Sequence, residues 1–345
     1  MKFHARFFFK IAPGLLGAFL CSLTGCDRKD QAGDWAAQGA PAPARVEVPV
    51  SQVAQAEARA GVPAGNLAAI SEGTVRFAVF NVENWLTMER SVGGKIQPGR
   101  PKPEKEKLAV TKLLASVQPD ILGVSEVGTE ADVKDLQAYL ERAGHPMPHS
   151  HLNRGADPTR SLVLSSRFPI GKTVVRENLS YRSNNRQYGM QRGILDATIA
   201  TPSGSYRFLG VHLKSKRESQ EGDQDEMRLN EAHLLRGEID KIIRDDATAR
   251  LVVYGDFNDT RNSPSLRAIR GGGKSATSLQ MISLKDSKGE YWTHYWDYED
   301  VYSRIDYVMV SDALRKSVEW DGCKIVETGE IGNASDHRPL LVILK

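Results

Sequence analysis

From about residue 74 onward, short continuous apolar runs alternate with longer segments in which apolar residues recur at helical spacing. The apolar runs are rich in β-branched and aromatic residues and are bounded by turn-forming residues, which is the pattern of buried strands. These predicted strands cover residues 74–85, 118–127, 160–166, 193–200, 206–213, 251–257, 303–311 and 339–345.

Two of the intervening segments carry apolar residues at positions i, i+4 and i+7, which places them on one helix face. They are Val110, Leu114 and Val117 in one segment, and Leu235, Ile239 and Ile242 in the other. Such stripes pack on a sheet, so the order of elements predicts an α/β fold. The turn residues 202–204 between two strand runs predict a hairpin, so we expect antiparallel pairs rather than a purely parallel sheet.

The first 73 residues follow a different pattern. Lys2, Arg6 and Lys10 precede the run "IAPGLLGAFLCSL", which is shorter than a membrane-spanning helix and fits a signal-peptide core. The following "LTGC" resembles the lipobox of bacterial lipoproteins, in which Cys26 is acylated; an ordinary signal peptide with an incidental cysteine is the alternative. We therefore expect a lipoprotein signal peptide at 1–25, a lipidated Cys26 with a flexible Ala-, Gly- and Pro-rich tether at 26–73, and a folded domain at 74–345.

Removal of the predicted signal peptide changes the net charge and leaves few cysteines. The chain of 345 residues has 46 basic and 43 acidic residues, and residues 1–26 hold three basic and no acidic ones, which leaves 43 of each. This balance argues against a strongly basic coat for nucleic acid and leaves only local patches. Cys323 is the one cysteine after Cys26, so no intramolecular disulfide is expected beyond that residue.

Carboxylate, amide and imidazole groups recur at the ends of the predicted strands. In "LVVYGDFNDT", residues 251–260, an apolar run leads into Asp256, Asn258 and Asp259. A turn explains these residues, because Gly, Asn and Asp are common in turns. A site for a hard cation such as Mg²⁺ explains them as well, because such cations prefer oxygen ligands.

Six motifs occur in the order typical of one family. They are "FNVENW", "PDILGVSEV", "VHLKSK", "YGDFND", "SRIDYVMVS" and "SDHRPL". In this order they resemble the endonuclease/exonuclease/phosphatase superfamily, the DNase I-like fold, over residues 74–345. The resemblance implies an α/β four-layer sandwich, in which two packed mixed or antiparallel sheets are flanked by helices and the active site lies at one end.

The resemblance also implies roles for individual residues. The implied metal ligands are Asn81, Glu83, Glu126 and Asp336, with Mg²⁺ as the expected ion and Mn²⁺ or Ca²⁺ as alternatives. The implied catalytic residues are His212, Asp256, Asn258, Asp306 and His337, where Asp306 orients His337 and both histidines face the phosphate. Arg192 occupies the position of a phosphate-binding arginine, and Lys214 either reaches substrate phosphates or is solvated. These cationic groups suit the negative charge that develops on phosphorus.

Several points stay open in the sequence. Taken alone, Asp306 fits a hydrogen-bonded strand-end carboxylate, and Asn81 fits a turn. The acidic partner of His212 has no clear match, and Asp157 is the one candidate. The aromatic run at 291–298 could stack on bases or enter lipid, but we expect half-buried packing.

These features predict a metal-dependent phosphodiester hydrolase that Cys26 holds on a bacterial membrane. A nuclease acting on DNA or RNA outside the cytoplasm is the leading interpretation, because "VHLKSK", "GDFND" and "RIDYV" resemble secreted bacterial nucleases. A phosphomonoesterase or a sphingomyelin or phospholipid phosphodiesterase is the alternative. A non-catalytic binding lipoprotein is disfavoured, because the constellation of carboxylates and histidines is complete.

The sequence leaves the substrate, the endo or exo mode, the metal and the membrane undecided. We expect a monomer at the periplasmic or extracellular face of the cell envelope. Asp27 resembles the inner-membrane retention signal of enteric bacteria, so it favours that membrane.

Cys26→Ala tests the predicted lipid anchor. Acyl chains contribute about 0.8 kcal/mol of membrane affinity per buried CH₂, and two or more chains anchor a protein stably. We expect the variant to lose incorporation of labelled fatty acid and lipoprotein-type cleavage of the signal peptide. Unchanged labelling would refute the assignment, and recovery of the wild type in outer-membrane fractions would contradict the inference from Asp27.

Overall fold

The computed structural model describes residues 73–176, 179–217, 220, 222–273, 275–327 and 333–345. The predicted signal peptide, Cys26, Asp27 and the tether up to residue 72 lie outside the described residues, so they stay predictions. Within the described residues, no helix combines the length and the apolar character needed to cross a bilayer.

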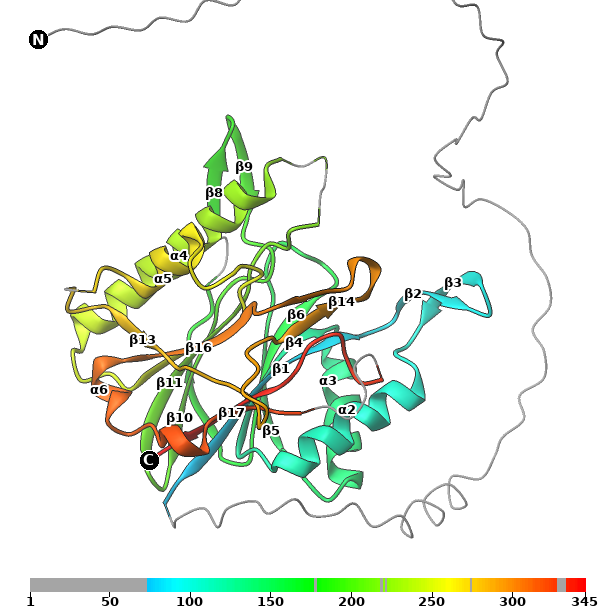
Figure 1. Cartoon of the computed structure of the whole chain (residues 1–345), viewed down its shortest axis with the longest axis horizontal. Coiled ribbons are helices and arrows are strands. Elements are labelled where there is room, and N and C mark those ends of the chain that lie inside the picture. The colour runs from blue at the N-terminus through cyan, green and yellow to red at the C-terminus, as the bar shows by residue number, and fades with distance from the viewer. Residues whose placement is uncertain (1–72, 177–178, 218–219, 221, 274, 328–332) are drawn as a thin grey trace, which may run out of the picture. The chain divides into compact units, whose positions relative to one another are not determined.

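Two six-stranded mixed sheets form the centre of the domain (Figure 1). The first has the order β17–β18–β1–β4–β6–β5 and consists of β1 (Val75–Trp85), β4 (Ile121–Val127), β5 (His149–Asn153), β6 (Ser161–Ser166), β17 (Lys324–Ile325) and β18 (Leu340–Leu344). The second has the order β13–β16–β12–β11–β10–β7 and consists of β7 (Ile170–Thr173), β10 (Leu195–Thr201), β11 (Gly204–His212), β12 (Leu251–Asp256), β13 (Leu279–Met281) and β16 (Asp306–Ser311). Each predicted strand run overlaps one of these strands.

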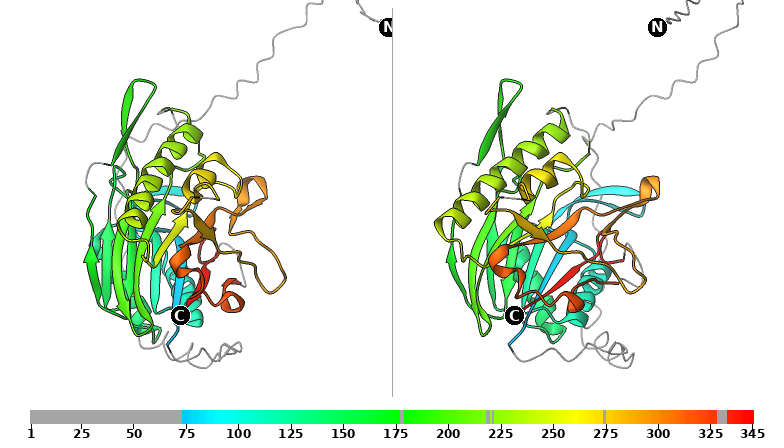
Figure 2. Two further views of the ribbon diagram at one scale, coloured as in Figure 1. Left: turned by 90° about the vertical axis from the view of Figure 1, so that its left-hand side faces the viewer. Right: turned by 60° about the vertical axis from the view of Figure 1, so that its left-hand side comes forward.

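The two sheets pack face to face, and helices cover their outer faces (Figures 1 and 2). The buried cluster between the sheets includes Phe77 of β1, Phe208 of β11 and Tyr254 of β12. Helices α2 (Glu104–Val117) and α3 (Glu130–Arg142) cover the first sheet, and α4 (Gln224–Asp245) and α5 (Pro264–Arg270) cover the second. This four-layer arrangement confirms the predicted fold class.

The predicted helix stripes are confirmed as the buried faces of α2 and α4. Val110 and Leu114 of α2 lie in the cluster with the first sheet, and Leu235, Ile239 and Ile242 of α4 lie in the cluster with the second. The side chain of Asp223 caps α4 by accepting hydrogen bonds from the backbone N–H groups of residues 225 and 226. The predicted hairpin is also confirmed, because β10 and β11 pair antiparallel with Thr201 opposite Gly204.

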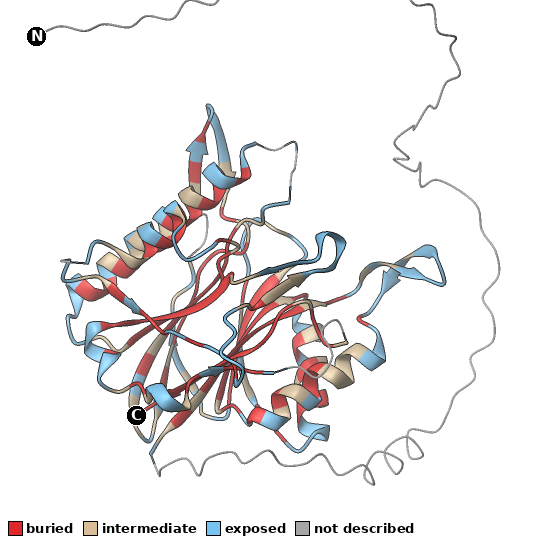
Figure 3. Cartoon of the chain, in the orientation of Figure 1, coloured by how far each residue is buried: buried red, intermediate tan, exposed pale blue. Residues whose placement is uncertain are grey.

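In the described part of the chain, three hairpins lie outside the large sheets, and the strand prediction included neither these hairpins nor the edge strands β5, β7, β13 and β17 of the large sheets. The hairpins are β2–β3 (Met88–Val92 and Lys95–Arg100), β8–β9 (Ser180–Ser183 and Arg186–Gly189) and β14–β15 (His294–Trp296 and Val301–Ser303). Figure 3 shows that these hairpins carry much exposed surface, whereas the strands of the two sheets are mostly buried. Strands with so little apolar burial lack the continuous apolar runs that identify core strands. Short elements α6 (Asp312–Arg315), η1 (Asp297–Glu299) and η2 (Trp320–Gly322) complete the described chain.

The directions of the strands place the polar residues at their ends along one edge of the sandwich. Each sheet contains one parallel pair, β1 with β4 and β11 with β12, so the carboxyl ends of each pair lie together. Strands β16 and β18 run antiparallel to these pairs, so their first residues lie at the same edge. In the second sheet, Asp256 is opposite both His212 and Asp306.

Gly255 makes the close approach of β12 to β11 possible. Its φ is +138°, and a Cβ at this position would lie 1.9 Å from the carbonyl oxygen of Val211. That separation is far below van der Waals contact, and the carbonyl belongs to the backbone of the paired strand, so neither group can move aside. The glycine of "YGDFND" is therefore a packing requirement directly before Asp256.

Gly255→Ala should destabilise the domain by about 3 kcal/mol or more, because the strand pair must separate or distort. Gly237→Ala is the matched control, since Gly237 lies within α4 and an added Cβ there has no atom within 4 Å. We expect the control to be stabilised by roughly 0.5 to 1 kcal/mol through helix propensity. Denaturant unfolding measures both, and equal stability of the two variants would contradict the packing argument.

Candidate active site

The carboxamide of Asn81 lies at the centre of the polar strand ends. Its Nδ2 donates to Oε1 of Glu126 at 3.2 Å and to Oδ2 of Asp256 at 3.1 Å, and lies 3.4 Å from Nε2 of His337. Its Oδ1 accepts a hydrogen bond from the backbone N–H of Glu83 at 3.0 Å. Asn81 is buried, so one amide connects groups from both sheets and from the loop before β18.

His337 is paired with Asp306 inside the domain. Its Nδ1 lies 2.8 Å from Oδ2 of Asp306, and its Nε2 lies 3.7 Å from Oδ2 of Asp256. Burial alone would lower the pKa of His337, but the negative charges of Asp306 and Asp256 outweigh it and raise the pKa well above its ordinary value. The structure thus favours a charged imidazolium at His337. Asp306 is held in turn by Thr293, whose Oγ1 accepts its backbone N–H at 3.1 Å.

His212 lies on the other side of Asp256 in a different electrostatic environment. Its Nε2 is 3.5 Å from Oδ2 of Asp256 and 3.9 Å from Oε1 of Glu126. Burial lowers the pKa of His212 well below its ordinary value, and the positive charges of Arg192 and His337 lower it further. His212 is therefore neutral where His337 is charged.

The suggested partner of His212 is wrong. Asp157 lies 3.5 Å from Nε of Arg192 and 3.9 Å from a terminal nitrogen of Arg160, so it pairs with two arginines. Nδ1 of His212 is buried and has no hydrogen-bond partner among the described residues. The order of residues along the chain could not show which cation the Asp157 side chain faces.

Asp256 lies between these two histidines and has an unusual proton affinity. Burial, and then repulsion from Asp306, raises the pKa of Asp256 to about 7, although His337 acts in the opposite direction. Its Oδ1 accepts the backbone N–H of Asn258 at 2.8 Å, and Nδ2 of Asn258 donates to the carbonyl of Leu213 at 2.9 Å. The structure thus places Asn258 beside Asp256 and orients both.

Three carboxylates line the side of the site formed by the first sheet. Oε2 of Glu83 accepts the backbone N–H of Asp336 at 3.1 Å, and Oε2 of Glu126 accepts that of Asn84 at 3.1 Å. Burial, followed by repulsion from Asp336, raises the pKa of Glu83 to about 7. A bound cation would relieve this repulsion, and Glu83, Glu126 and Asp336 offer the oxygen donors that a hard divalent ion prefers; that they bind one ion together stays a prediction. The NH₂ group of Asn81 faces Glu126 in this arrangement, so its role as a further ligand stays a prediction.

Backbone conformation marks the same place. Glu83, Asn84, Glu126 and Asn258 all have a left-handed backbone, with φ between 48° and 66°. Such conformations are uncommon for residues other than glycine and concentrate at functional sites.

The two predicted phosphate-binding residues lie on segments that Glu231 joins. Buried Glu231 accepts the backbone N–H of Gln191 at 2.8 Å and that of Lys214 at 2.7 Å. Arg192 follows Gln191 directly, is itself buried, and contributes positive charge at His212. Arg192 is therefore brought to the site; for Lys214 the structure places the backbone near it, and phosphate binding stays a prediction.

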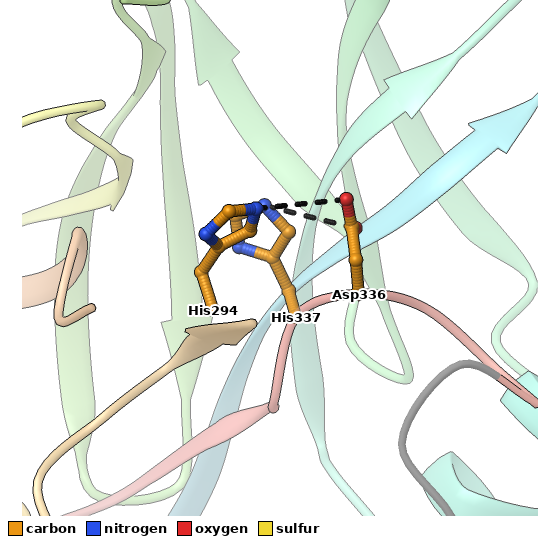
Figure 4. A group of neighbouring side chains, drawn as sticks. All are labelled: His294, Asp336 and His337. Atoms are coloured by element: carbon orange, nitrogen blue, oxygen red, sulfur yellow. Dashed lines mark ion pairs between the residues drawn. The ribbon is translucent and has the colours of Figure 1, made fainter. Parts of the chain in front are cut away.

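Two residues of the site were missing from the sequence prediction. Nε of Arg160 donates to Oδ1 of Asn84 at 2.9 Å and lies 3.8 Å from Oε2 of Glu126. Nε2 of His294 lies 3.6 Å from Oδ2 of Asp336, and its ring centroid is 4.7 Å from that of His337 (Figure 4). Arg160 is the first residue of the predicted strand 160–166, and His294 lies within the aromatic run 291–298. These positions are the sequence signals that could have identified the two residues.

The aromatic run itself is more exposed than expected. Trp292 and Tyr295 are half-buried, as predicted, but Tyr291, Trp296 and Tyr298 are exposed, the last by 85%. The reason is that β14–β15 pairs outside the two large sheets, so one face of the hairpin meets solvent.

The comparisons with known proteins point to one family. The profile described as "Endonuclease/Exonuclease/phosphatase family" matches residues 92–337, which is more than two thirds of the chain. The match begins after Asn81 and Glu83 and contains the other predicted site residues of the folded domain. No curated protein matches the sequence significantly.

Solved structures share the fold at low sequence identity. An endonuclease/exonuclease/phosphatase from Bacteroides vulgatus is 19% identical, with a TM-score of 0.54, over 79% of this chain and 98% of that chain. Truncated Caenorhabditis elegans TDP2 is 16% identical, with a TM-score of 0.54, over 79% and 97%. The human Nocturnin catalytic domain, solved with a bound sulfate anion, is 16% identical, with a TM-score of 0.54, over 80% and 95%.

Asp306→Asn tests the pairing of Asp306 with His337. The substitution keeps the size of the side chain but removes the negative charge, so the pKa of His337 should fall. Titration of the His337 ring signals by NMR measures the change. Asp312→Asn is the control, because Asp312 is exposed at the start of α6. The same titration midpoint in the wild type and both variants would contradict the assigned charge pair.

Proposed function

The chain belongs to the endonuclease/exonuclease/phosphatase family, whose members are generally metal-dependent phosphoester hydrolases, and we propose that it is a Mg²⁺-dependent phosphodiesterase that cleaves DNA or RNA. One observation carries the catalytic part of this proposal. Asp256, with a pKa raised to about 7, lies between a neutral His212 and a charged His337, beside three carboxylates that suit a divalent ion.

This arrangement supplies the parts that phosphodiester hydrolysis needs. Asp256 can accept a proton from the attacking water, because a general base works best with a pKa near the working pH. Asn258, oriented by its bonds to Asp256 and Leu213, can hold that water or a phosphate oxygen. The charged His337 and Arg192 oppose the negative charge that develops on the phosphate. A bound Mg²⁺ would add positive charge at the Glu83, Glu126 and Asp336 side.

Two basic hairpins beside the site support a nucleic acid substrate. The segment β2–β3 carries Arg90, Lys95 and Arg100 against one acidic residue, and β8–β9 carries Arg182 and Arg186 with no acidic residue. Both project from the body of the domain in Figure 1. After β3, Lys102 donates to the carbonyl of Glu83 at 2.9 Å, and Arg192 lies three residues after the end of β9, so the chain returns to the site after each hairpin. A polyanion contacts such cations over several phosphates, whereas a small phosphomonoester cannot.

A sphingomyelin or phospholipid phosphodiesterase is the second candidate. The exposed Trp296 and Tyr298 lie on the hairpin whose His294 faces His337, and aromatic side chains of this kind also enter the interfacial region of membranes. We keep the membrane anchor at Cys26, the envelope location and the monomeric state as parts of the proposal.

The deciding assay uses the full-length protein in detergent with plasmid DNA, RNA, sphingomyelin and a small phosphodiester, each with Mg²⁺, Mn²⁺, Ca²⁺ or EDTA. We expect cleavage of DNA or RNA with Mg²⁺ and none with EDTA. Asp256→Asn should lower turnover by about 10²- to 10⁴-fold on every substrate, because it removes the general base. Turnover unaffected by EDTA would overturn the metal-dependent mechanism.

Charge variants separate the substrate classes. Removal of two phosphate contacts in the double variant Arg182→Gln, Arg186→Gln should raise KM for nucleic acid several-fold and weaken its salt dependence, while cleavage of the small diester changes little. Lys172→Gln is the control, because Lys172 is exposed on β7. Hydrolysis of sphingomyelin alone would replace the nuclease proposal with the lipid one.

A further inference from the structure

Two imidazoles and one carboxylate lie close to one another at the His337 loop (Figure 4). Nε2 of His294 is 3.6 Å from Oδ2 of Asp336, and Nε2 of His337 is 3.9 Å from Oδ1 of Asp336. The three ligand atoms lie within 4.8 Å of one another. We propose that His294, Asp336 and His337 form a binding site for a transition-metal ion such as Zn²⁺, and that occupancy of this site inhibits hydrolysis.

Both imidazoles are held in the way that metal-binding histidines are held. Nδ1 of His337 lies 2.8 Å from Oδ2 of Asp306, and Nδ1 of His294 lies 3.3 Å from Oγ of Ser303. In metal sites, the ring nitrogen that does not bind the ion commonly donates to such an oxygen, which sets the tautomer and orients the ring. Both rings therefore point Nε2 toward Asp336. On His337 a bound ion takes the place of the proton that Nε2 carries in the charged imidazolium, so binding there releases that proton.

Backbone pairing sets the spacing of the three ligands. His294 of β14 forms an antiparallel bridge with His337. On either side of it, the N–H of Arg338 donates to the carbonyl of Thr293 at 2.7 Å, and the N–H of Tyr295 donates to that of Asp336 at 2.9 Å. The site is thus built on two segments that hydrogen bonds hold together, rather than on independent loops.

The donor set and the exposure select the kind of ion. Two nitrogens and one oxygen suit Zn²⁺ and similar ions, whereas Mg²⁺ prefers oxygen alone. Ligand atoms about 2.0 to 2.1 Å from a tetrahedral ion lie roughly 3.4 Å apart. The three ligand atoms here lie within 4.8 Å of one another, so side-chain movements that shorten these separations by up to about 1.4 Å complete the site. The side chain of Asp336 is 42% exposed and that of His294 20%, so an ion can enter from solvent and keep a water molecule.

The effect on activity follows from the shared ligands and rests on the proposed function. An ion on Nε2 of His337 occupies the atom that would contact the scissile phosphate. The carboxylate of Asp336 would also be drawn toward His294 and away from the proposed Mg²⁺ position, where Glu83 accepts the backbone N–H of Asp336. Zn²⁺ should therefore inhibit the Mg²⁺-dependent reaction without replacing Mg²⁺ in it.

The test measures Zn²⁺ binding to the full-length protein by competition with a chromophoric chelator, in the presence of excess Mg²⁺. We expect one bound Zn²⁺ per chain and weakening by at least about tenfold in His294→Gln. Ser303→Ala, which leaves all three ligands in place, should weaken binding by about 10- to 100-fold through loss of ring orientation. His233→Gln is the control, because His233 is exposed on α4. Equal affinity of the wild type and both site variants would overturn the site.

Inhibition is then measured as the Zn²⁺ concentration that halves each protein's own Mg²⁺-dependent rate. This concentration should rise by at least about tenfold in His294→Gln and stay unchanged in His233→Gln. Tight Zn²⁺ binding that leaves turnover unaffected would overturn the inhibitory role. A wild type that binds Zn²⁺ but hydrolyses no phosphodiester would overturn the proposed function and leave the metal site standing.

Discussion

The hydrogen bonds of the buried Asn81 amide hold the site together. Glu126 of the first sheet and Asp256 of the second are both acidic, and their charges repel when they are brought together in a buried place. Nδ2 of Asn81 donates to both, at 3.2 and 3.1 Å, so the amide supplies the positive end of a dipole between them. Because Asn81 belongs to β1 and Asp256 to β12, the same contact joins the two sheets at the edge where the site lies.

Burial and neighbouring charges give the two histidines opposite states. Burial lowers the pKa of His337, but Asp306 and Asp256 outweigh it, so His337 is charged. Burial lowers the pKa of His212 and the nearby positive charges of Arg192 and His337 lower it further, so His212 is neutral. Both are within 4 Å of the same carboxylate, Asp256. One edge of the sandwich therefore holds a cationic His337, a neutral His212 and Asp256 as a base with a pKa of about 7. Their surroundings, and not the residue types alone, set these properties.

The β14–β15 hairpin connects the catalytic edge with the solvent. Thr293 at its start holds the backbone of Asp306, His294 faces Asp336, and the exposed Trp296 lies at the end of the same strand. A hairpin outside the large sheets can vary without disturbing the core, yet its backbone pairing with the His337 loop transmits any shift to the site. This combination explains how the exposed aromatic side chains and the proposed metal site occupy one small element.

The sequence by itself determined the eight inner core strands, the stripes of α2 and α4, and the strand-end residues such as Asp256 and His337; it missed β5, β7, β13 and β17, the edge strands of the large sheets. Local apolar runs and short motifs report burial and residue type directly. Tertiary structure alone decided which side chains face one another, because the direction of a side chain depends on how the sheets and loops are aligned. Asp157 pairs with Arg192 instead of His212. His294 lies near Asp336 because a backbone bridge joins His294 to His337, far away in the chain. The exposed hairpins were not predicted from the sequence either, because a strand that buries few apolar side chains has no continuous apolar run.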